Sequence, residues 1–190
     1  MLRGTIAATA LVALASGADA RPASRGWYAE GGLGAVQFLP STNKDAATGP
    51  AIGVRIGRDL FSFLSFGVHL GASSHEATVP APPEGEWFQL YRAAVDARIG
   101  GRFDRLALFL EGGVGAAMIS SNILSKVMIT DVDEELSLMF QAGAGAEYQL
   151  ENRHYAIGLG VDGFLLPQFK PPDGSPVLAL DYRFYLRYTY

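Results

Sequence analysis

The sequence predicts an all-β fold, an eight-stranded antiparallel up-and-down transmembrane β-barrel that follows a cleaved signal peptide. Three observations support it: apolar and polar residues alternate along the mature chain, the alternating segments number eight, and short and long connections follow each other in turn. The 190 residues are 49% hydrophobic, too apolar for a disordered chain, and their number favours one domain. We therefore divide the chain into a signal peptide, residues 1–20, and a barrel domain, residues 21–190.

The first twenty residues have the pattern of a secretory signal peptide. Arg3 is the only charge before an apolar run at residues 6–15, and Ala18 and Ala20 form a small-residue cleavage pattern. A run of about ten apolar residues is too short for a membrane-spanning helix, which needs ~20. We expect cleavage after Ala20 and an exported mature chain.

Seven segments alternate before the last one, and each is predicted as a strand. They cover residues 27–38, 51–57, 60–72, 87–99, 106–118, 136–148 and 155–166. In chain order, the polar faces of the first four carry Glu30, then Arg55, then His69, then Arg92, Asp96 and Arg98. Those of the next three carry Glu111, then Gln141 and Glu147, then Asp162. Period two over such lengths indicates strands with one apolar face.

The last segment, residues 177–190, shows the clearest alternation. Apolar and aromatic side chains occupy one face, whereas Asp181, Arg183 and Arg187 lie on the other. Its length suits a membrane strand, which needs ~9–11 tilted residues, while strands of globular proteins average five or six.

The connections alternate in length as well. Short turns are predicted at residues 57–59, 100–105 and 149–154, and long polar connections at residues 39–50, 73–86, 119–135 and 167–176. Short turns at one end and long loops at the other are typical of barrels in the bacterial outer membrane.

Three further observations favour an apolar face that points outward to lipid. All three lysines lie in the long connections, the polar faces are rich in Gly and Ala, and aromatic residues gather at both strand ends. The short-turn rim would carry Trp27, Phe61, Tyr148, Tyr155, Tyr188 and Tyr190. The long-loop rim would carry Phe38, Trp87, Phe88 and Tyr91. The alternative is a soluble periplasmic ligand-binding barrel, which turns its apolar face inward.

The polar faces would place nearly balanced charges inside the barrel. These are Glu30, Arg55, Arg92, Asp96, Arg98, Glu111, Glu147, Asp162, Asp181, Arg183 and Arg187, with His69 beside them. Because charges in a narrow lumen are costly unless paired, we predict a structural network of ion pairs. In it, Arg92, Arg98, Arg183 and Arg187 would pair with Glu30, Glu111, Glu147, Asp96 and Asp181. Many of the 23 glycines share the inward register and would leave room for it. The alternative is a narrow ion pore.

Taken together, these features resemble the small outer-membrane β-barrel families of Gram-negative bacteria, of OmpA-barrel and OmpX type. In those families the alternating apolar residues of the last strand, ending on an aromatic, are read by the barrel-assembly machinery. The resemblance implies that signal for Tyr182, Phe184, Leu186, Tyr188 and Tyr190. It also implies a location in the outer membrane, among its lipid and lipopolysaccharide, and specifies no activity.

An enzyme that modifies lipid A is a further alternative. The deacylase type needs a Ser nucleophile, a His base and an acid near the outer rim. Residue types for it occur at His69, Ser73, Ser74, His75 and Glu76. The His-x-Ser-Asn pattern of the deacylases is absent, so we expect no enzyme, no catalytic residue and no cofactor.

The long connections are the predicted working surface, because binding residues concentrate on loops held by a rigid scaffold. The third carries an apolar group, Ile123, Leu124, Val127, Met128 and Ile129, and an acidic group, Asp131, Asp133, Glu134 and Glu135. We read the acidic group as a solvated loop and predict no metal site; the alternative is loose binding of Ca²⁺ or a bridge to lipopolysaccharide through divalent ions. The net charge of −4 offers no basic stripe for nucleic acid. The sequence thus predicts a structural or surface-interaction role, with an extracellular or envelope protein as partner.

Overall fold

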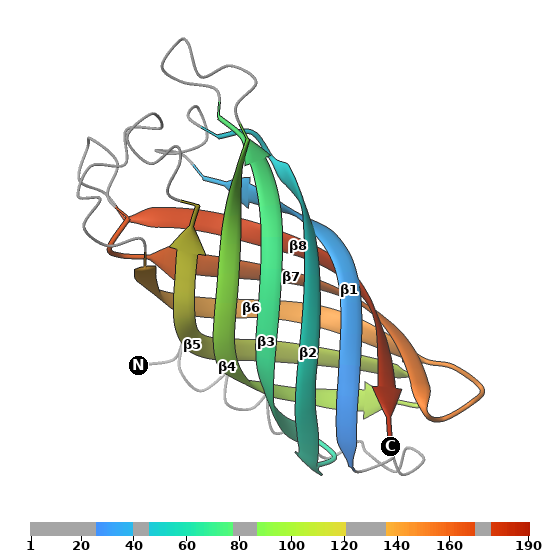
Figure 1. Cartoon of the computed structure of the whole chain (residues 1–190). Coiled ribbons are helices and arrows are strands. Elements are labelled where there is room, and N and C mark those ends of the chain that lie inside the picture. The colour runs from blue at the N-terminus through green and yellow to red at the C-terminus, as the bar shows by residue number, and fades with distance from the viewer. Residues whose placement is uncertain (1–25, 40–45, 78–86, 121–135, 170–175) are drawn as a thin grey trace, which may run out of the picture.

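The computed structural model describes residues 26–39, 46–77, 87–120, 136–169 and 176–190 (Figure 1). The predicted signal peptide lies outside these ranges. The strands are β1 Trp27–Phe38, β2 Gly49–Phe61, β3 Leu64–Glu76, β4 Trp87–Phe103, β5 Leu106–Ile119, β6 Leu136–Gln149, β7 Tyr155–Leu166 and β8 Val177–Thr189. Within the described ranges, no helix is long and apolar enough to cross a membrane.

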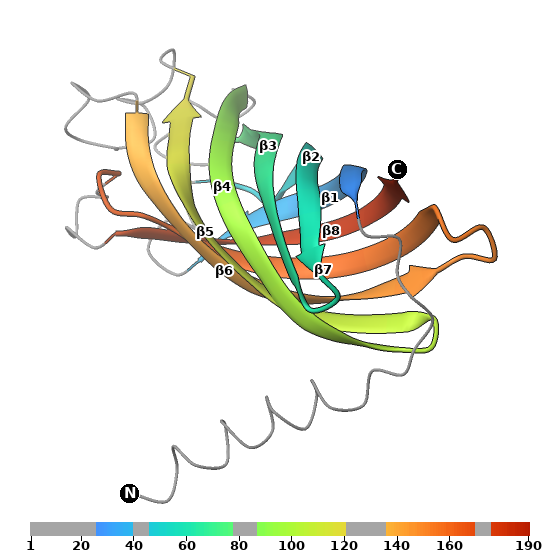
Figure 2. The ribbon, with the colours of Figure 1, turned by 90° about the horizontal axis from the view of Figure 1, so that it is seen from below.

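The eight strands form one closed antiparallel sheet. Each strand pairs with the next along the chain, and β1 pairs with β8 from Tyr28 opposite Thr189 to Phe38 opposite Ala179. Figure 2 shows the strands curving around a common axis. The predicted up-and-down barrel is confirmed, and closure leaves no unpaired edge in contact with lipid.

The outer wall of the barrel is apolar. Leu33 is 67% exposed, Leu159 is 62% exposed and Val95 is 57% exposed, whereas Glu30 and Arg55 are buried on the inner face. A wall of exposed aliphatic and aromatic side chains suits hydrocarbon and would be unfavourable in water. The outward orientation is confirmed, and the soluble barrel with an inward apolar face is wrong.

The hairpin between β2 and β3 turns later than predicted. The turn residues are Ser62 and Phe63, whereas the sequence predicted a turn at residues 57–59. Both Gly57 and Arg58 remain in the ladder with β1, opposite Tyr28 and Trp27. Gly57 is there to make room, because a Cβ at this position would collide with the ring of Tyr28.

Two other strands also extend beyond their predicted ends. β3 continues to Glu76, so residues 73–76 are strand and not loop. β4 continues to Phe103, and the chain then turns through Asp104 and Arg105. Asp104 adopts a positive φ of 52°, a conformation that Asp tolerates better than most residues.

Two of the aromatic residues assigned to the long-loop rim point inward. Trp87 and Tyr91 are exposed on the outer wall as predicted, but Phe38 and Phe88 are 2% exposed and lie inside the barrel. The reason is the two-residue period, which sends adjacent residues such as Trp87 and Phe88 to opposite faces.

Candidate functional site

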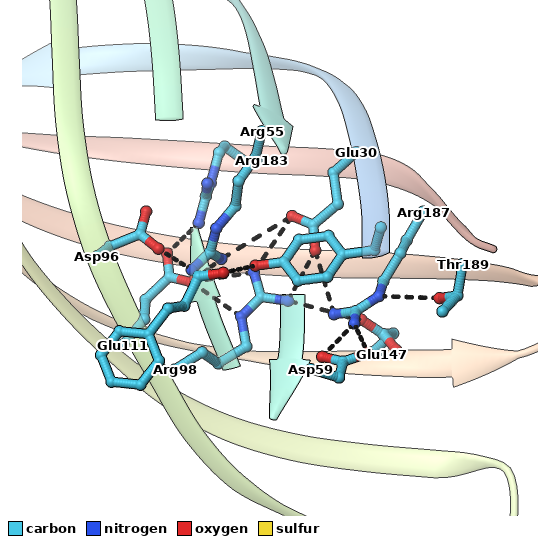
Figure 3. Close-up of polar contacts among 12 residues, drawn as sticks. Glu30, Arg55, Asp59, Asp96, Arg98, Glu111, Glu147, Arg183, Arg187 and Thr189 are labelled. Carbon is cyan, nitrogen blue, oxygen red and sulfur yellow. Dashed lines mark hydrogen bonds and ion pairs between the residues drawn. The ribbon is translucent and has the colours of Figure 1, made fainter. Parts of the chain in front are cut away.

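The lumen holds the buried side chains of the barrel, which fill it in two layers. An apolar layer lies toward the ends of the strands that carry the long connections. A charged layer fills the middle and the short-turn end, where strands from all sides contribute (Figure 3). We call them the apolar layer and the charged layer. The charged layer consists of Glu30, Arg55, Asp59, Asp96, Arg98, Arg102, Glu111, Glu147, Asp162, Arg183 and Arg187.

The apolar layer is a cluster of buried side chains from seven strands and the residues just beyond them. Its larger members are Val36, Phe38, Phe88, Leu90, Ile119, Met139, Phe164, Leu166, Phe169 and Val177. The sequence prediction missed this layer because it treated the inward face as polar throughout. Adjacent apolar pairs such as Met139–Phe140 and Leu165–Leu166 were the available signal, since they place apolar groups on both faces.

Glu30, Arg98 and Glu111 form the centre of the charged layer. Arg98 donates from Nη1 to Glu30 Oε1 at 2.9 Å and from Nη2 to Glu111 Oε2 at 3.0 Å. Its guanidinium also lies 3.9 Å from the centre of the Phe109 ring. All these groups are buried, so the pairing offsets the cost of removing them from water.

Glu111 joins two further arginines to this centre. Arg55, which is 2% exposed, donates to Glu111 at 2.9 Å and also pairs with Asp96. Arg183 pairs with Glu111 and lies 2.6 Å from Asp162. Glu111 on β5 therefore connects β2, β4 and β8 across the lumen.

Two residues that the sequence placed in turns complete the short-turn end of the layer. Asp59 accepts a hydrogen bond of 2.6 Å from Arg187, which also contacts Glu30 at 3.3 Å. Arg102 donates to Glu147 at 3.2 Å and to Gln149 at 2.9 Å. Neither Asp59 nor Arg102 was predicted to face the lumen, because both were assigned to turns and the true turns lie further along the chain.

Arg92 and Asp181 form a separate pair nearer the apolar layer. They are 2.7 Å apart, and the Arg92 guanidinium lies 4.6 Å from the centre of the Phe164 ring. His69 faces inward close by and is buried. All the charges that the sequence assigned to the lumen therefore face inward, and each has an opposite charge in reach. The pairing differs in detail, because Asp96 binds Arg55.

Glycines make room for the large side chains of the lumen. Tyr28 lies over Gly57, Tyr185 over Gly158 and Phe109 over Gly145, so a Cβ on each of these glycines would collide with the ring. Tyr28 in turn packs against Arg187, whose guanidinium lies 3.9 Å from the ring centre. The sequence indicated the small residues but not these aromatic rings.

Of the residues considered for catalysis, only Ser73 and His75 lie inside the apolar layer at the end of β3, because Ser74 and Glu76 occupy the outward register and His69 lies nearer the Arg92–Asp181 pair. Ser73 and His75 share the inward face, and Ser73 Oγ lies 2.8 Å from His75 Nε2. His75 Nδ1 lies 3.0 Å from the carbonyl oxygen of Ala47, and because a carbonyl oxygen only accepts, Nδ1 is the donor in this hydrogen bond. The ring is 0% exposed and sits between Phe38 and Phe88.

The other predicted site residues lie on the outer wall or outside the described ranges. Tyr182, Phe184, Leu186 and Tyr188 face outward on β8, followed by exposed Tyr190. Tyr188 packs against Tyr155 and Tyr190, with ring centres 4.9 Å apart in both pairs. The apolar and acidic groups of residues 123–135 lie outside the described ranges. Among the described residues, no group of three or more His, Asp or Glu side chains could hold a metal ion.

Comparison with known proteins places this architecture in a family. The chain belongs to the outer membrane protein beta-barrel domain family, whose model matches residues 6–184. Its location is therefore the outer membrane. A search of the curated proteins finds no match.

Solved structures show the same fold at low sequence identity. Neisserial surface protein A (NspA) is 12% identical with a TM-score of 0.63, and the alignment covers 86% of this chain and 97% of that one. OprG from Pseudomonas aeruginosa is 9% identical with a TM-score of 0.61, covering 90% and 99%. The outer membrane enzyme PagL is 14% identical with a TM-score of 0.51, covering 86% and 99%. At these identities the likeness concerns the fold alone.

Proposed function

We propose that this protein is a closed structural barrel of the outer membrane that serves as a scaffold for surface interaction with an extracellular or envelope protein. The observation that carries the proposal is the filled lumen. The charged layer and the apolar layer are stacked along the barrel axis, and their members are almost entirely buried. Function would then lie on the outer end of the barrel, where the long connections emerge.

A narrow ion pore is the alternative that the closed lumen disfavours. Eight strands enclose an interior just wide enough for side chains to fill. The purified protein in a planar lipid bilayer should give no stable single-channel current. A reproducible open state in the unmodified protein would contradict the closed barrel, and a wide porin measured alongside provides the positive control.

Surface interaction can be tested in living cells with photo-crosslinking residues. A crosslinker at Leu124 or Met128 in the third long connection should capture one defined partner band. The same group at Val95, which faces lipid on β4, is the matched control and should capture none. Equal labelling patterns from both positions would contradict a loop-mediated role.

We propose no catalytic role for the Ser73–His75 pair, although its hydrogen bond resembles that of an activated nucleophile. Burial among the described residues supports this view, because Ser73 is 4% exposed and the His75 ring beside it lies between Phe38 and Phe88. Mass spectra of lipid A from expressing and deleted cells should be identical. A shorter or longer acyl pattern that disappears with Ser73→Ala would overturn the proposal.

We also propose that the outward row of β8 is the signal for the barrel-assembly machinery. Tyr190 at the end of this row is 67% exposed, so its ring is accessible from outside the barrel. Replacement of Tyr190 by Asp should lower the amount of folded barrel in outer-membrane fractions. Replacement by Phe should not.

A further inference from the structure

Arg58 differs from the lumen arginines because it faces outward. Its registered partners are Trp27 on β1 and Phe66 on β3, both exposed on the outer wall. The guanidinium lies 5.8 Å from the centre of the Trp27 ring. Within the described ranges Arg58 forms no ion pair, and the only other charge on the outward faces of the strands is Glu76 at the long-loop end.

A trough of small side chains begins one strand beyond Phe66, the neighbour of Arg58, and crosses the outer wall. The successive registered partners after Phe66 are Ala97, Gly112, Ala142 and Gly163, one on each strand from β4 to β7. The flanking positions are Val95, Val114, Phe140 and Leu165 on one side, and Ile99, Leu110, Ala144 and Val161 on the other, and all but Ala144 are larger. The first part, from Arg58 to Gly112, is an open groove of about 680 Å³.

We propose that this trough binds one glycerophospholipid of the periplasmic leaflet, with its phosphate at Arg58 and an acyl chain along the small residues. Arg58 lies close to Phe61, where β2 ends at the short-turn rim, and short turns mark the periplasmic side. A guanidinium pairs with phosphate through a fork of N–H donors. Trp27 beside it is the residue type that settles at headgroup depth.

The dimensions of the trough fit an acyl chain. Five steps between neighbouring strands separate Arg58 from Gly163, and at ~4.8 Å each they span about 24 Å. This path is long enough for an extended acyl chain, and because the strands are tilted by ~35–45° it runs obliquely up the wall. The trough also rises away from the periplasmic rim. Arg58 lies near Phe61, the short-turn end of β2, whereas Gly112 lies further from Leu106, the short-turn end of β5.

A second copy of the chain suits this surface less well. Two barrels in one membrane share the same orientation, so a two-fold contact would place the same patch against itself. Two concave troughs would then face each other, and two unpaired Arg58 guanidinium groups would meet at the same depth. An anionic headgroup with a flexible chain complements both the charge and the hollow shape.

Native mass spectrometry of the purified barrel in a mild detergent tests the site, with phosphatidylglycerol as the added probe. We expect one retained lipid per barrel. Gly112→Leu fills the trough and should lower the lipid-bound fraction at least tenfold, and Arg58→Gln should do the same. Ala93→Leu adds the same side chain to an outward position beside Leu70 and Ala116 and should change retention less than twofold. Arg58→Lys should retain most binding.

The fold of each variant is checked by heat-dependent gel mobility. Gly112→Leu is expected to fold because a Cβ there meets only the Gln141 carbonyl oxygen at 3.7 Å. Should it fail, Ala142→Leu fills the same trough. Equal lipid retention by all folded variants would overturn the proposal. So would preferential retention of lipopolysaccharide, or a dimer that Gly112→Leu dissociates, since these identify a different occupant.

Discussion

At the scale of single residues, the interior depends on glycines that lie beneath large side chains. Gly57 is confined by the Tyr28 ring and the Phe66 carbonyl, and Tyr28 in turn supports Arg187. Gly31, in contrast, faces lipid, and a Cβ at this position would meet no atom within 4 Å. Both glycines add the same backbone freedom to the unfolded chain. In the folded protein, however, Gly57 is enclosed by other atoms and Gly31 has open space beside it.

We predict that Gly57→Ala lowers the free energy of unfolding by about 1–3 kcal/mol, the usual cost of overpacking a filled core. Gly31→Ala should change it by less than about 0.5 kcal/mol, as expected for an exposed position. Both values come from urea titrations of the barrel folded into lipid vesicles. Similar losses in the two variants would show that backbone freedom, not space, explains these glycines.

At the scale of elements, the hairpin between β2 and β3 shows why strand ends are hard to locate from sequence. Gly57 and Asp59 are common turn residue types, yet both remain in the sheet together with Arg58. The true turn contains Phe63, which stacks on Phe61 with ring centres 5.5 Å apart. Tertiary contacts with Tyr28 and Arg187 override the local preference.

A single inserted glycine distinguishes the two turn positions. After Ser62 it lengthens an exposed turn, and the unfolding free energy should fall by less than about 1 kcal/mol, since surface loops tolerate insertions. After Arg58 it should cost several times more, because a one-residue slip sends Asp59 to the lipid face and removes its bond to Arg187. Unfolding titrations check both, and equal costs would contradict the structural register.

Much of the fold and part of the site could be predicted from sequence because alternation specifies which face each residue occupies. The number of strands, the closed barrel and the inward position of the lumen charges all follow from that period. The particular partners do not, because Glu111 binds Arg55 and Arg183, which lie on distant strands. The apolar layer was missed because Phe38 and Phe88 are the same residue type as the rim aromatics that face lipid.

At the scale of the whole molecule, the two layers block the lumen independently. Phe88 and Phe164 contribute to the apolar layer, and Glu30 and Arg98 meet in the middle of the charged layer. Each layer contains fully buried large side chains. Removal of either layer alone would therefore leave the barrel closed.

We predict that Phe88→Ala with Phe164→Ala produces no single-channel current in planar bilayers. The double change Glu30→Ala with Arg98→Ala removes both members of an ion pair, so it leaves fewer unpaired charges than either single change. The barrel of this variant should also remain closed. The four changes together should give a small, discrete conductance. A current from the apolar-layer variant alone would show that the charged layer is permeable to ions.

The charged layer has a consequence for how the barrel enters the membrane. Its partners come from opposite ends of the chain, as in the contact of Arg187 with Glu30, so the layer is complete only after β8 has joined β1. Before that step, an open sheet would expose uncompensated carboxylates and guanidinium groups to hydrocarbon, at a cost of several kcal/mol each. Insertion and closure are thereby coupled into one cooperative event, and a half-built barrel has no stable place within the bilayer.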